Sequence, residues 1–389
     1  MVSFSDRPAF LAACDHARTI ALSAYVLPQS VAERLARDAR HGARVSVTLV
    51  ARPLGGTFEE QDELAARNLR AIRTIERAGG RGRLLPHRIP LHMKAAVLDG
   101  SVAFLDDRNW SDDGSQTILR DDDPADVAAV ARALALHAAS TSRLATVKPE
   151  SLALETALIG NARAPLSVES ESFGRGVVYD ALEAAAKRGV STRLLVAQRE
   201  VDAAAAKNGR ELKALGTLAH DGIDVRVTPS DEKMAIAGDA AWVGSTNATS
   251  AAGFFARQLD WGMTTQDAAI VAGLRDRFEQ TWKAAVPWPR YAAASAPNAA
   301  RAFTSVRAET SSTLTPSTSA TARALSTTYA GSFRLPRNGT GARYGQSVSS
   351  TMRSIPTART ASRSAPAVLN VTTPPIPSHK PNSEVNSRA

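Results

Sequence analysis

The sequence predicts an α/β protein built from two similar halves. Short, almost continuously apolar segments alternate with charged amphipathic segments, a pattern typical of a sheet covered by helices. The same order of segments returns roughly 140 residues further along the chain, as in a duplicated sequence. The composition then shifts to Ala, Ser, Thr, Pro and scattered Arg. We therefore expect one half over 1–148, a second over 149–290, and a disordered tail over 291–389.

Local signals support each expected element of the first half. Residues 31–41 form an amphipathic pattern that ends at Gly42, and residues 57–78 form a longer one that ends at Gly79, because glycine commonly stops helices. The apolar run 45–50 between them predicts a buried strand. The other expected elements are helices over 10–17 and 125–141 and strands over 19–26 and 83–85.

Residues 92–109 predict a β-hairpin, because two apolar runs flank an Asp99-Gly100 turn. Alternate side chains of a strand share one face, so His92 and Lys94 should point the same way, with Asn109 brought close by the partner strand. An imidazole, an ammonium and an amide at one point suit phosphoryl chemistry. The alternative is a surface hairpin with a solvated His and Lys.

The spacing of these residues resembles the phospholipase D superfamily, whose pattern is His-x-Lys-x4-Asp followed by Gly-Ser-x-Asn. The first block is complete, and Asn is retained in the second. The Gly and Ser positions hold acidic residues. The matching residues are His92, Lys94, Asp99 and Asn109, and the departures are Asp106 and Asp107.

A second copy of the pattern lies over 231–247. Lys233 is present and Gly244-Ser245-Thr246-Asn247 is complete, but Asp231 stands at the His position and the motif Asp is displaced to Asp239. The separation between matching residues falls from 147 at Gly42 and Gly189 to 138 at Asn109 and Asn247, as small deletions would cause. The second half is expected to contain strands over 166–171, 192–196 and 223–228 and helices over 177–188, 208–221 and 267–282.

The resemblance implies two tandem phospholipase D-like halves and a phosphodiesterase or phosphatidyltransferase that acts on a phosphodiester, with phospholipid as the first expectation. It implies that His92 forms a phosphohistidine and that no metal or cofactor is needed. The implied phosphate-holding residues are Lys94, Asn109, Lys233, Ser245 and Asn247.

Replacement of the second His changes the expected acid. A carboxylate beside Lys233 should have a lowered pKa and be a poor proton donor at neutral pH. If the protein is catalytic, Asp231 takes the donor role and activity should favour acidic pH. Asp107 adds a further negative charge where phosphate should bind.

Three carboxylates are candidates for orienting the catalytic groups. Asp121 and the two acidic residues after it precede Pro124, so they either cap a helix or hold His92 through its ring nitrogen. Asp260 occupies the matching place in the second half, and Asp99 belongs to the motif itself.

Composition restricts the alternatives. Of 47 basic and 38 acidic residues, eleven basic and two acidic ones lie in 291–389, which leaves 36 of each in the preceding part. This neutral balance makes a nuclease-like member that holds nucleic acid through its tail the less expected class. The second alternative is a degenerate member that binds phosphate esters or lipid head groups without turnover. The lone Cys14 excludes an internal disulfide.

No secretory signal and no bilayer-spanning apolar stretch is apparent, so the sequence predicts a cytoplasmic protein. Peripheral membrane contact and homodimer formation are left open.

Overall fold

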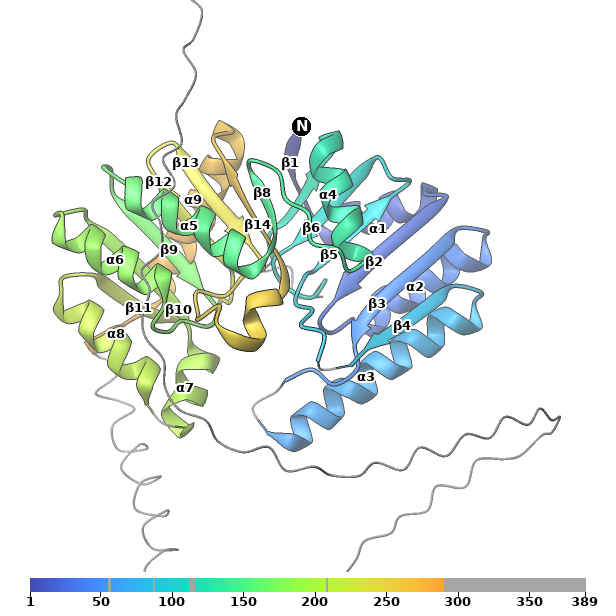
Figure 1. The fold of residues 1–389 in the computed structure, drawn as a ribbon, viewed down its shortest axis with the longest axis horizontal. Helices are drawn as coiled ribbons and strands as arrows, with labels where there is room; N and C mark the ends of the chain where they lie inside the picture. The colour runs from blue at the N-terminus through green and yellow to red at the C-terminus, as the bar shows by residue number, and fades with distance from the viewer. Residues whose placement is uncertain (55–56, 87, 112–115, 208, 290–389) are drawn as a thin grey trace, which may run out of the picture. The chain divides into compact units, whose positions relative to one another are not determined.

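The computed structural model describes residues 1–289 except 55–56, 87, 112–115 and 208, and it also leaves out the side chains of 206 and 207. The disordered tail expected over 291–389 lies outside these residues. The described chain forms two mixed sheets (Figure 1).

The first sheet has the strand order β1-β7-β6-β5-β2-β3-β4. Strands β2, β3 and β4 are parallel, and β5, β6 and β7 add to them in antiparallel fashion. The elements of this half are β1 (Val2–Ser5), α1 (Arg7–His16), β2 (Thr19–Ala24), α2 (Gln29–Arg40), β3 (Arg44–Val50), α3 (Phe58–Arg77), β4 (Arg81–Leu85), β5 (Ala95–Leu98), β6 (Val102–Asp106), β7 (Ile118–Asp121) and α4 (Pro124–Leu134).

The second sheet has the order β15-β11-β10-β9-β12-β13-β14-β8, which repeats the first sheet's order with β15 added at the edge. Its elements are β8 (Leu144–Val147), α5 (Lys148–Asn161), β9 (Leu166–Ser170), α6 (Val177–Lys187), β10 (Thr192–Ala197), α7 (Gln198–Lys207), α8 (Arg210–His220), β11 (Asp224–Thr228), β12 (Met234–Ala237), β13 (Ala240–Gly244), the 3₁₀ helix η1 (Gly253–Arg257), β14 (Leu259–Thr265), α9 (Ala268–Ala284) and β15 (Val286–Pro287). The expected α/β fold with two similar halves is confirmed.

Each sheet is apolar on both faces because one face meets helices and the other meets the opposite half. In β5, Ala96 and Leu98 pack into a core of the first half, and Ala95 and Val97 pack into a core shared by both sheets. Figure 1 shows α2 and α3 beside β3 and β4, and α6 and α8 beside β10 and β11. Burial on both faces explains the continuous apolar strands of the sequence.

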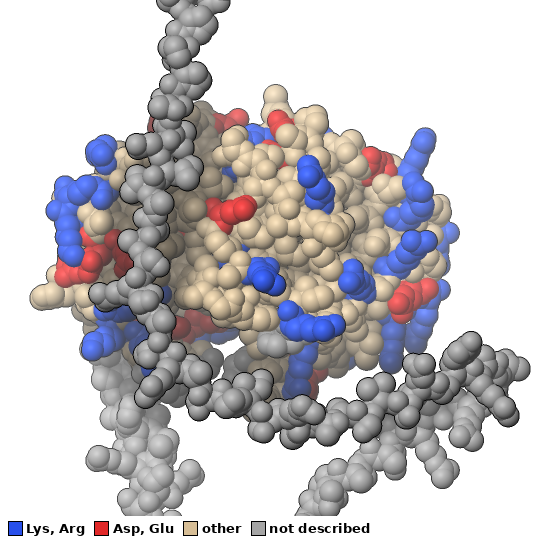
Figure 2. Space-filling view, viewed as in Figure 1, with Lys and Arg blue, Asp and Glu red and all other residues tan. Residues whose placement is uncertain are grey.

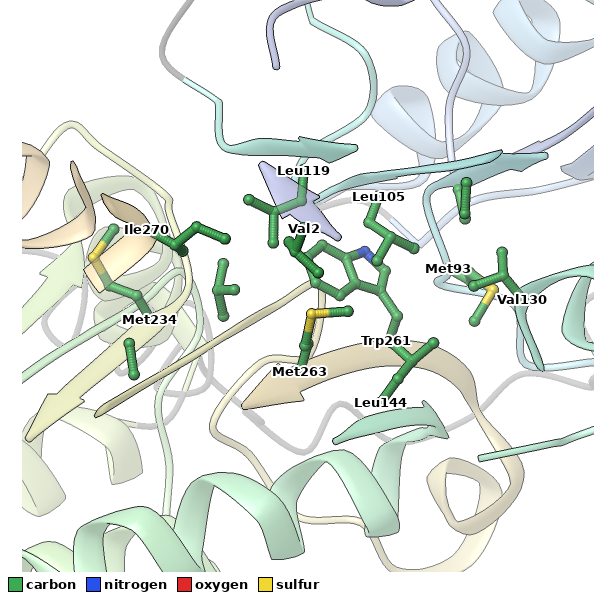
Figure 3. Close-up of a cluster of buried hydrophobic side chains, with 14 of the residues drawn as sticks. Val2, Met93, Leu105, Leu119, Val130, Leu144, Met234, Trp261, Met263 and Ile270 are labelled. Carbon is green, nitrogen blue, oxygen red and sulfur yellow. The ribbon is translucent and has the colours of Figure 1, made fainter. Parts of the chain in front are cut away.

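The shared core joins the two halves. Trp261 of β14 is fully buried and lies among Leu105 and Leu119 of the first sheet and Met263 of the second (Figure 3). Its indole N–H donates to the backbone oxygen of Asp106 at 2.8 Å. The bridge between Leu91 and Leu259 and the hydrogen bond from the His92 N–H to the Leu259 oxygen add backbone contacts between the halves.

The structure corrects several expected bounds. Strand β5 begins at Ala95, so His92 and Lys94 lie in the irregular segment before it. Helix α4 ends at Leu134, not near residue 141, and Leu136 adopts a left-handed backbone conformation shortly after. Strands β1, β7, β8, β14 and β15 and helices α5 and α7 were not predicted. β8 pairs with β14, so the chain enters the second sheet before residue 149.

Charge is distributed over the surface. On the face shown in Figure 2, Lys and Arg side chains are spread with Asp and Glu among them. None of the helices that the structure describes is both long and apolar enough to cross a bilayer.

Candidate active site

His92 is held between an ammonium and a carboxylate. Lys94 Nζ lies 2.8 Å from His92 Nε2, and Asp260, from the other half, approaches His92 Nδ1 at 3.3 Å. Lys94 Nζ also lies 3.1 Å from Nδ1. Because a carboxylate can only accept, the tautomer that hydrogen-bonds to Asp260 carries its proton on Nδ1. The carboxylate thereby fixes the ring orientation and the tautomer, as in a catalytic triad.

Burial and nearby charge adjust the protonation of this pair. Burial and the charge of Lys94 lower the pKa of His92, with Asp260 opposing them. Burial and the charge of Lys233 lower the pKa of Lys94 to about 8. At neutral pH the imidazole is therefore uncharged and can act as a nucleophile, and the ammonium remains largely charged.

Lys233 lies in the same charged environment but has different partners. Its ammonium contacts a carboxylate oxygen of Glu171 at 3.0 Å and the backbone oxygens of Asp231 and Asp107 at 3.0 and 3.2 Å. Burial would lower the pKa of Lys233, but Glu171 and the other carboxylates raise it above its usual value. Burial alone would raise the pKa of Glu171, but the charges of Lys233, Lys94 and His92 hold it below its usual range.

Each motif Asn lies at the carboxyl end of a central strand. The Asn109 side-chain oxygen accepts from the backbone N–H groups of Tyr25 and Val26, just after β2. The Asn247 oxygen accepts from the N–H of Ser172, just after β9. Both residues line one cavity. In each, the oxygen is engaged and the NH₂ group is the part suited to donate to a ligand.

Ser245 does not occupy the expected phosphate-holding position. It is fully buried, its hydroxyl donates to Asp260, and it accepts the N–H of Trp261 at 3.1 Å. Ser245 therefore positions the carboxylate that holds His92.

The expected donor role of Asp231 needs correction. Arg108 Nε lies 2.5 Å from one Asp231 oxygen, and Arg108 Nη2 donates to the other at 3.1 Å. One guanidinium thus contacts both carboxylate oxygens and donates a hydrogen bond to one of them, and Asp231 is not among the residues that line the cavity. The geometry favours an ion pair across the two halves over a proton donor.

Asp107 also differs from expectation. It is fully buried and accepts the N–H of Thr117 at 2.9 Å. Burial and the neighbouring Glu232 raise its pKa well above the usual range. The carboxyl group faces the interior and is not among the residues that line the cavity, so it does not occupy the phosphate position.

Two of the three candidate orienting carboxylates lie elsewhere. Asp99 forms the turn after β5 and accepts the backbone N–H groups of Arg18 and Thr19, at the start of β2. Asp121 pairs with Arg143 at 3.2 Å and lies opposite Ala103 in the sheet, at the far end of the hairpin from His92. The capping alternative applies to Asp123, whose side chain caps α4. Asp260 alone of the three contacts His92.

A cavity of about 600 Å³ opens beside these groups. Its polar lining includes His92, Asn109, Asn247 and Glu171, and Lys94 and Lys233 lie buried next to it. The walls also carry apolar side chains, namely Leu54, Leu64, Ile89, Leu91, Phe254 and Phe255.

Sequence reasoning missed three charged residues at the site: Glu171, Arg199 and Arg108. Glu171 follows β9, and the carboxyl ends of sheet strands are where α/β proteins commonly bind ligands, so its position was a usable signal. Arg108 falls at the variable position of the motif, and its contact with Asp231 bridges 123 residues. In the part of the chain that the structure describes, no group of three or more His, Cys, Asp or Glu is arranged to hold a metal ion.

A half-buried imidazole with a carboxylate partner, beside two lysines and two amides, defines a class of site suited to phosphoryl chemistry. The sequence model of the family described as "Cardiolipin synthase, PLD-like domain" matches residues 156–282. No curated protein matches the sequence.

Two solved structures share the fold. The phosphatidylserine synthase of Haemophilus influenzae has a TM-score of 0.53 at 10% identity, with 74% of this chain and 87% of that chain covered. The polyphosphate kinase of Porphyromonas gingivalis has a TM-score of 0.51 at 16% identity, with 72% of this chain covered. This chain spans 46% of that kinase's length. The second half of the chain thus resembles a phospholipase D-like domain in sequence, and the chain shares the fold of these two structures.

Proposed function

We propose that the protein processes a phosphodiester, with phospholipid as the favoured substrate, through a covalent intermediate on His92. The observation that carries this proposal is the position of His92 at the cavity wall, with a neutral imidazole held by Asp260 and Lys94. Lys94, Lys233 and the two motif amides are the groups proposed to hold the phosphate oxygens.

In the first step the Nε2 lone pair attacks phosphorus and forms a P–N bond. The bond from phosphorus to the leaving oxygen breaks, and its electron pair departs with that oxygen. Lys94 must move from Nε2 to a phosphate oxygen for this to occur, since it now donates to the attacking atom. Asp260 stabilises the positive charge that develops on the imidazole.

In the second step the oxygen of water or of an alcohol attacks phosphorus, the P–N bond breaks, and the electron pair returns to the imidazole. The proton of the attacking hydroxyl group is released to solvent. Water as the nucleophile gives hydrolysis, and an alcohol gives phosphatidyl transfer. Because Asp231 is paired with Arg108, the proposal assigns no side chain to protonate the leaving oxygen. Substrates whose leaving group is stable as an anion should therefore react fastest.

The phospholipid proposal draws on the apolar cavity wall. Phe254 and Phe255 of η1 line the cavity and are 40% and 37% exposed, so aromatic side chains stand at its edge. Such an edge suits contact with acyl chains or a bilayer surface. The similar fold of a phosphatidylserine synthase is consistent with this substrate class.

Turnover of bis-p-nitrophenyl phosphate by wild type and His92→Ala tests the proposal. The nitrophenolate leaving group needs no protonation, so the assay bypasses the missing second His. We expect turnover by wild type, its loss in His92→Ala, and a phosphohistidine that survives an alkaline quench and is lost on treatment with acid. Equal rates in the two proteins would reject the role of His92.

A second candidate function is binding of phosphate esters without turnover, favoured by the ion pair of Asp231 with Arg108 at the place of the second His. Saturable binding of a diester that depends on Lys94, without turnover of an activated ester, would select this candidate.

A further inference from the structure

Lys233 has no free donor for a substrate. An ammonium offers three N–H donors. In this structure its three acceptors are the Glu171 carboxylate and the backbone oxygens of Asp231 and Asp107. A phosphate oxygen can bind Lys233 only if one of them withdraws.

Of these acceptors, the Glu171 carboxylate is the one that can move. The two backbone oxygens belong to the segments just before β12 and just after β6, which strand pairing holds in place. Glu171 is attached through a rotatable side chain, follows the end of β9 and lines the cavity. Its other oxygen already lies 2.7 Å from Arg199, which is 67% exposed on its side chain. Arg199 can therefore keep the carboxylate after it leaves Lys233.

Glu171 also determines the charge of the site. Lys94 and Lys233 bring two positive charges, and the charge of Glu171 acts on both lysines and on His92. Asp260 is already engaged by His92 and Ser245. A carboxylate that stays within a few ångströms after displacement repels an incoming anion, and the repulsion doubles when the anion carries two charges.

We propose that Glu171 holds the place of a phosphate oxygen on Lys233 and selects singly charged phosphodiesters over doubly charged phosphomonoesters. This inference rests on the proposed function, since it requires a phosphate group in this site. It adds a specificity-determining residue that lies outside both sequence motifs.

Titration calorimetry with two small esters tests the inference. Dimethyl phosphate carries one charge at pH 7.5, and methyl phosphate, with a second pKa of about 6, carries mostly two. Glu171→Gln keeps the side-chain size and removes the charge. We expect Glu171→Gln to bind dimethyl phosphate about tenfold more tightly and methyl phosphate about a hundredfold more tightly than wild type. The second factor is the square of the first, because the Glu171 carboxylate repels each charge of the ester equally.

Glu200→Gln is the matched control. Glu200 lines the same cavity and lies 3.2 Å from Arg199, yet it is not an acceptor of Lys233. Glu200→Gln should change both affinities by less than about threefold, since the Glu200 carboxylate is partly exposed and solvent screens its charge. Melting curves establish that both variants are folded, and Glu171→Ala provides a second charge-removing variant.

The outcomes separate the inference from the proposed function. The first set of outcomes keeps the phosphate site, because Lys94→Met abolishes binding. If Glu171→Gln then leaves binding unchanged, weakens it, or strengthens it equally for the two esters, the inference alone is overturned. If neither wild type nor either Glu171 variant binds the esters, the phosphate site itself is overturned, and the inference with it. The same follows if binding survives Lys94→Met.

Discussion

At the scale of single residues, His92 and Lys94 set the pH range in which the site can react. Attack requires a neutral imidazole, and phosphate binding requires a charged ammonium. The pKa of His92 is lowered from its ordinary value, chiefly by burial, and that of Lys94 is lowered to about 8. Between the pKa of His92 and the pKa of Lys94, the imidazole is neutral and the ammonium is charged.

We therefore expect kcat/KM for a nitrophenyl diester to fall as the pH drops through the lowered pKa of His92 and to fall again as it rises above about 8. This differs from the acidic optimum that Asp231 as donor would produce. A pH–rate profile measures it, and a rate that keeps rising as pH falls below 5 would contradict the assignment.

A pair of matched substitutions separates the two carboxylates near the motifs. Asp260→Asn should lower turnover by about 100-fold, because the amide no longer stabilises the His92 tautomer and its positive charge. Asp231→Asn should change turnover by less than about threefold, because its oxygens are engaged by Arg108. The two variants are compared on one diester whose leaving group needs protonation; a larger loss in Asp231→Asn would restore Asp231 as the candidate donor.

At the scale of elements, the motif hairpin serves the fold as well as the site. Asp99 has a φ of 52° and accepts two backbone N–H groups from the start of β2, so it ties the hairpin turn to the adjacent strand. It lies away from the reacting end of the hairpin, which separates its role from that of His92.

Asp99→Ala should lower the free energy of unfolding by about 1–3 kcal/mol, because it removes the hydrogen bonds from Arg18 and Thr19 and leaves a residue poorly suited to positive φ. Turnover per folded molecule should not change. Urea unfolding measures the loss, with Asp99→Asn as control, since Asn retains an acceptor and tolerates this backbone region. A loss of turnover without loss of stability would indicate a direct role at the site.

At the scale of the whole described chain, we expect the shared core to make the two halves one cooperative unit. Leu105 and Leu119 from the first sheet meet Trp261 and Met263 from the second, so neither half buries its own apolar face alone (Figure 3). The indole of Trp261 also ends on a backbone oxygen of the first half.

Trp261→Ala should lower the free energy of unfolding by about 3–5 kcal/mol, and Trp261→Phe by less, because a large buried side chain is lost in the first case and largely replaced in the second. Denaturation followed by tryptophan fluorescence and by circular dichroism should give coincident transitions in wild type. Two separate transitions would mean that the halves unfold independently.

The sequence by itself determined the duplicated α/β fold and the first residues of the site. Apolar runs, glycine stops and the Asp99-Gly100 turn act over a few residues, so they can be interpreted without three-dimensional information. The spacing of His92, Lys94 and Asn109 is equally local. The unpredicted strands β1, β7, β8 and β14 pair at or near the sheet edges, where short segments carry weak patterns.

The tertiary structure alone decided which group each of these residues contacts. Asp260 reaches His92 from 168 residues away, Arg108 pairs with Asp231 across 123 residues, and Glu171 takes a donor of Lys233. Such contacts depend on how two sheets pack through a shared core and bring distant strand ends together. Periodicity along the chain carries no information about that packing, because it reports the burial of a side chain and not the identity of its neighbour.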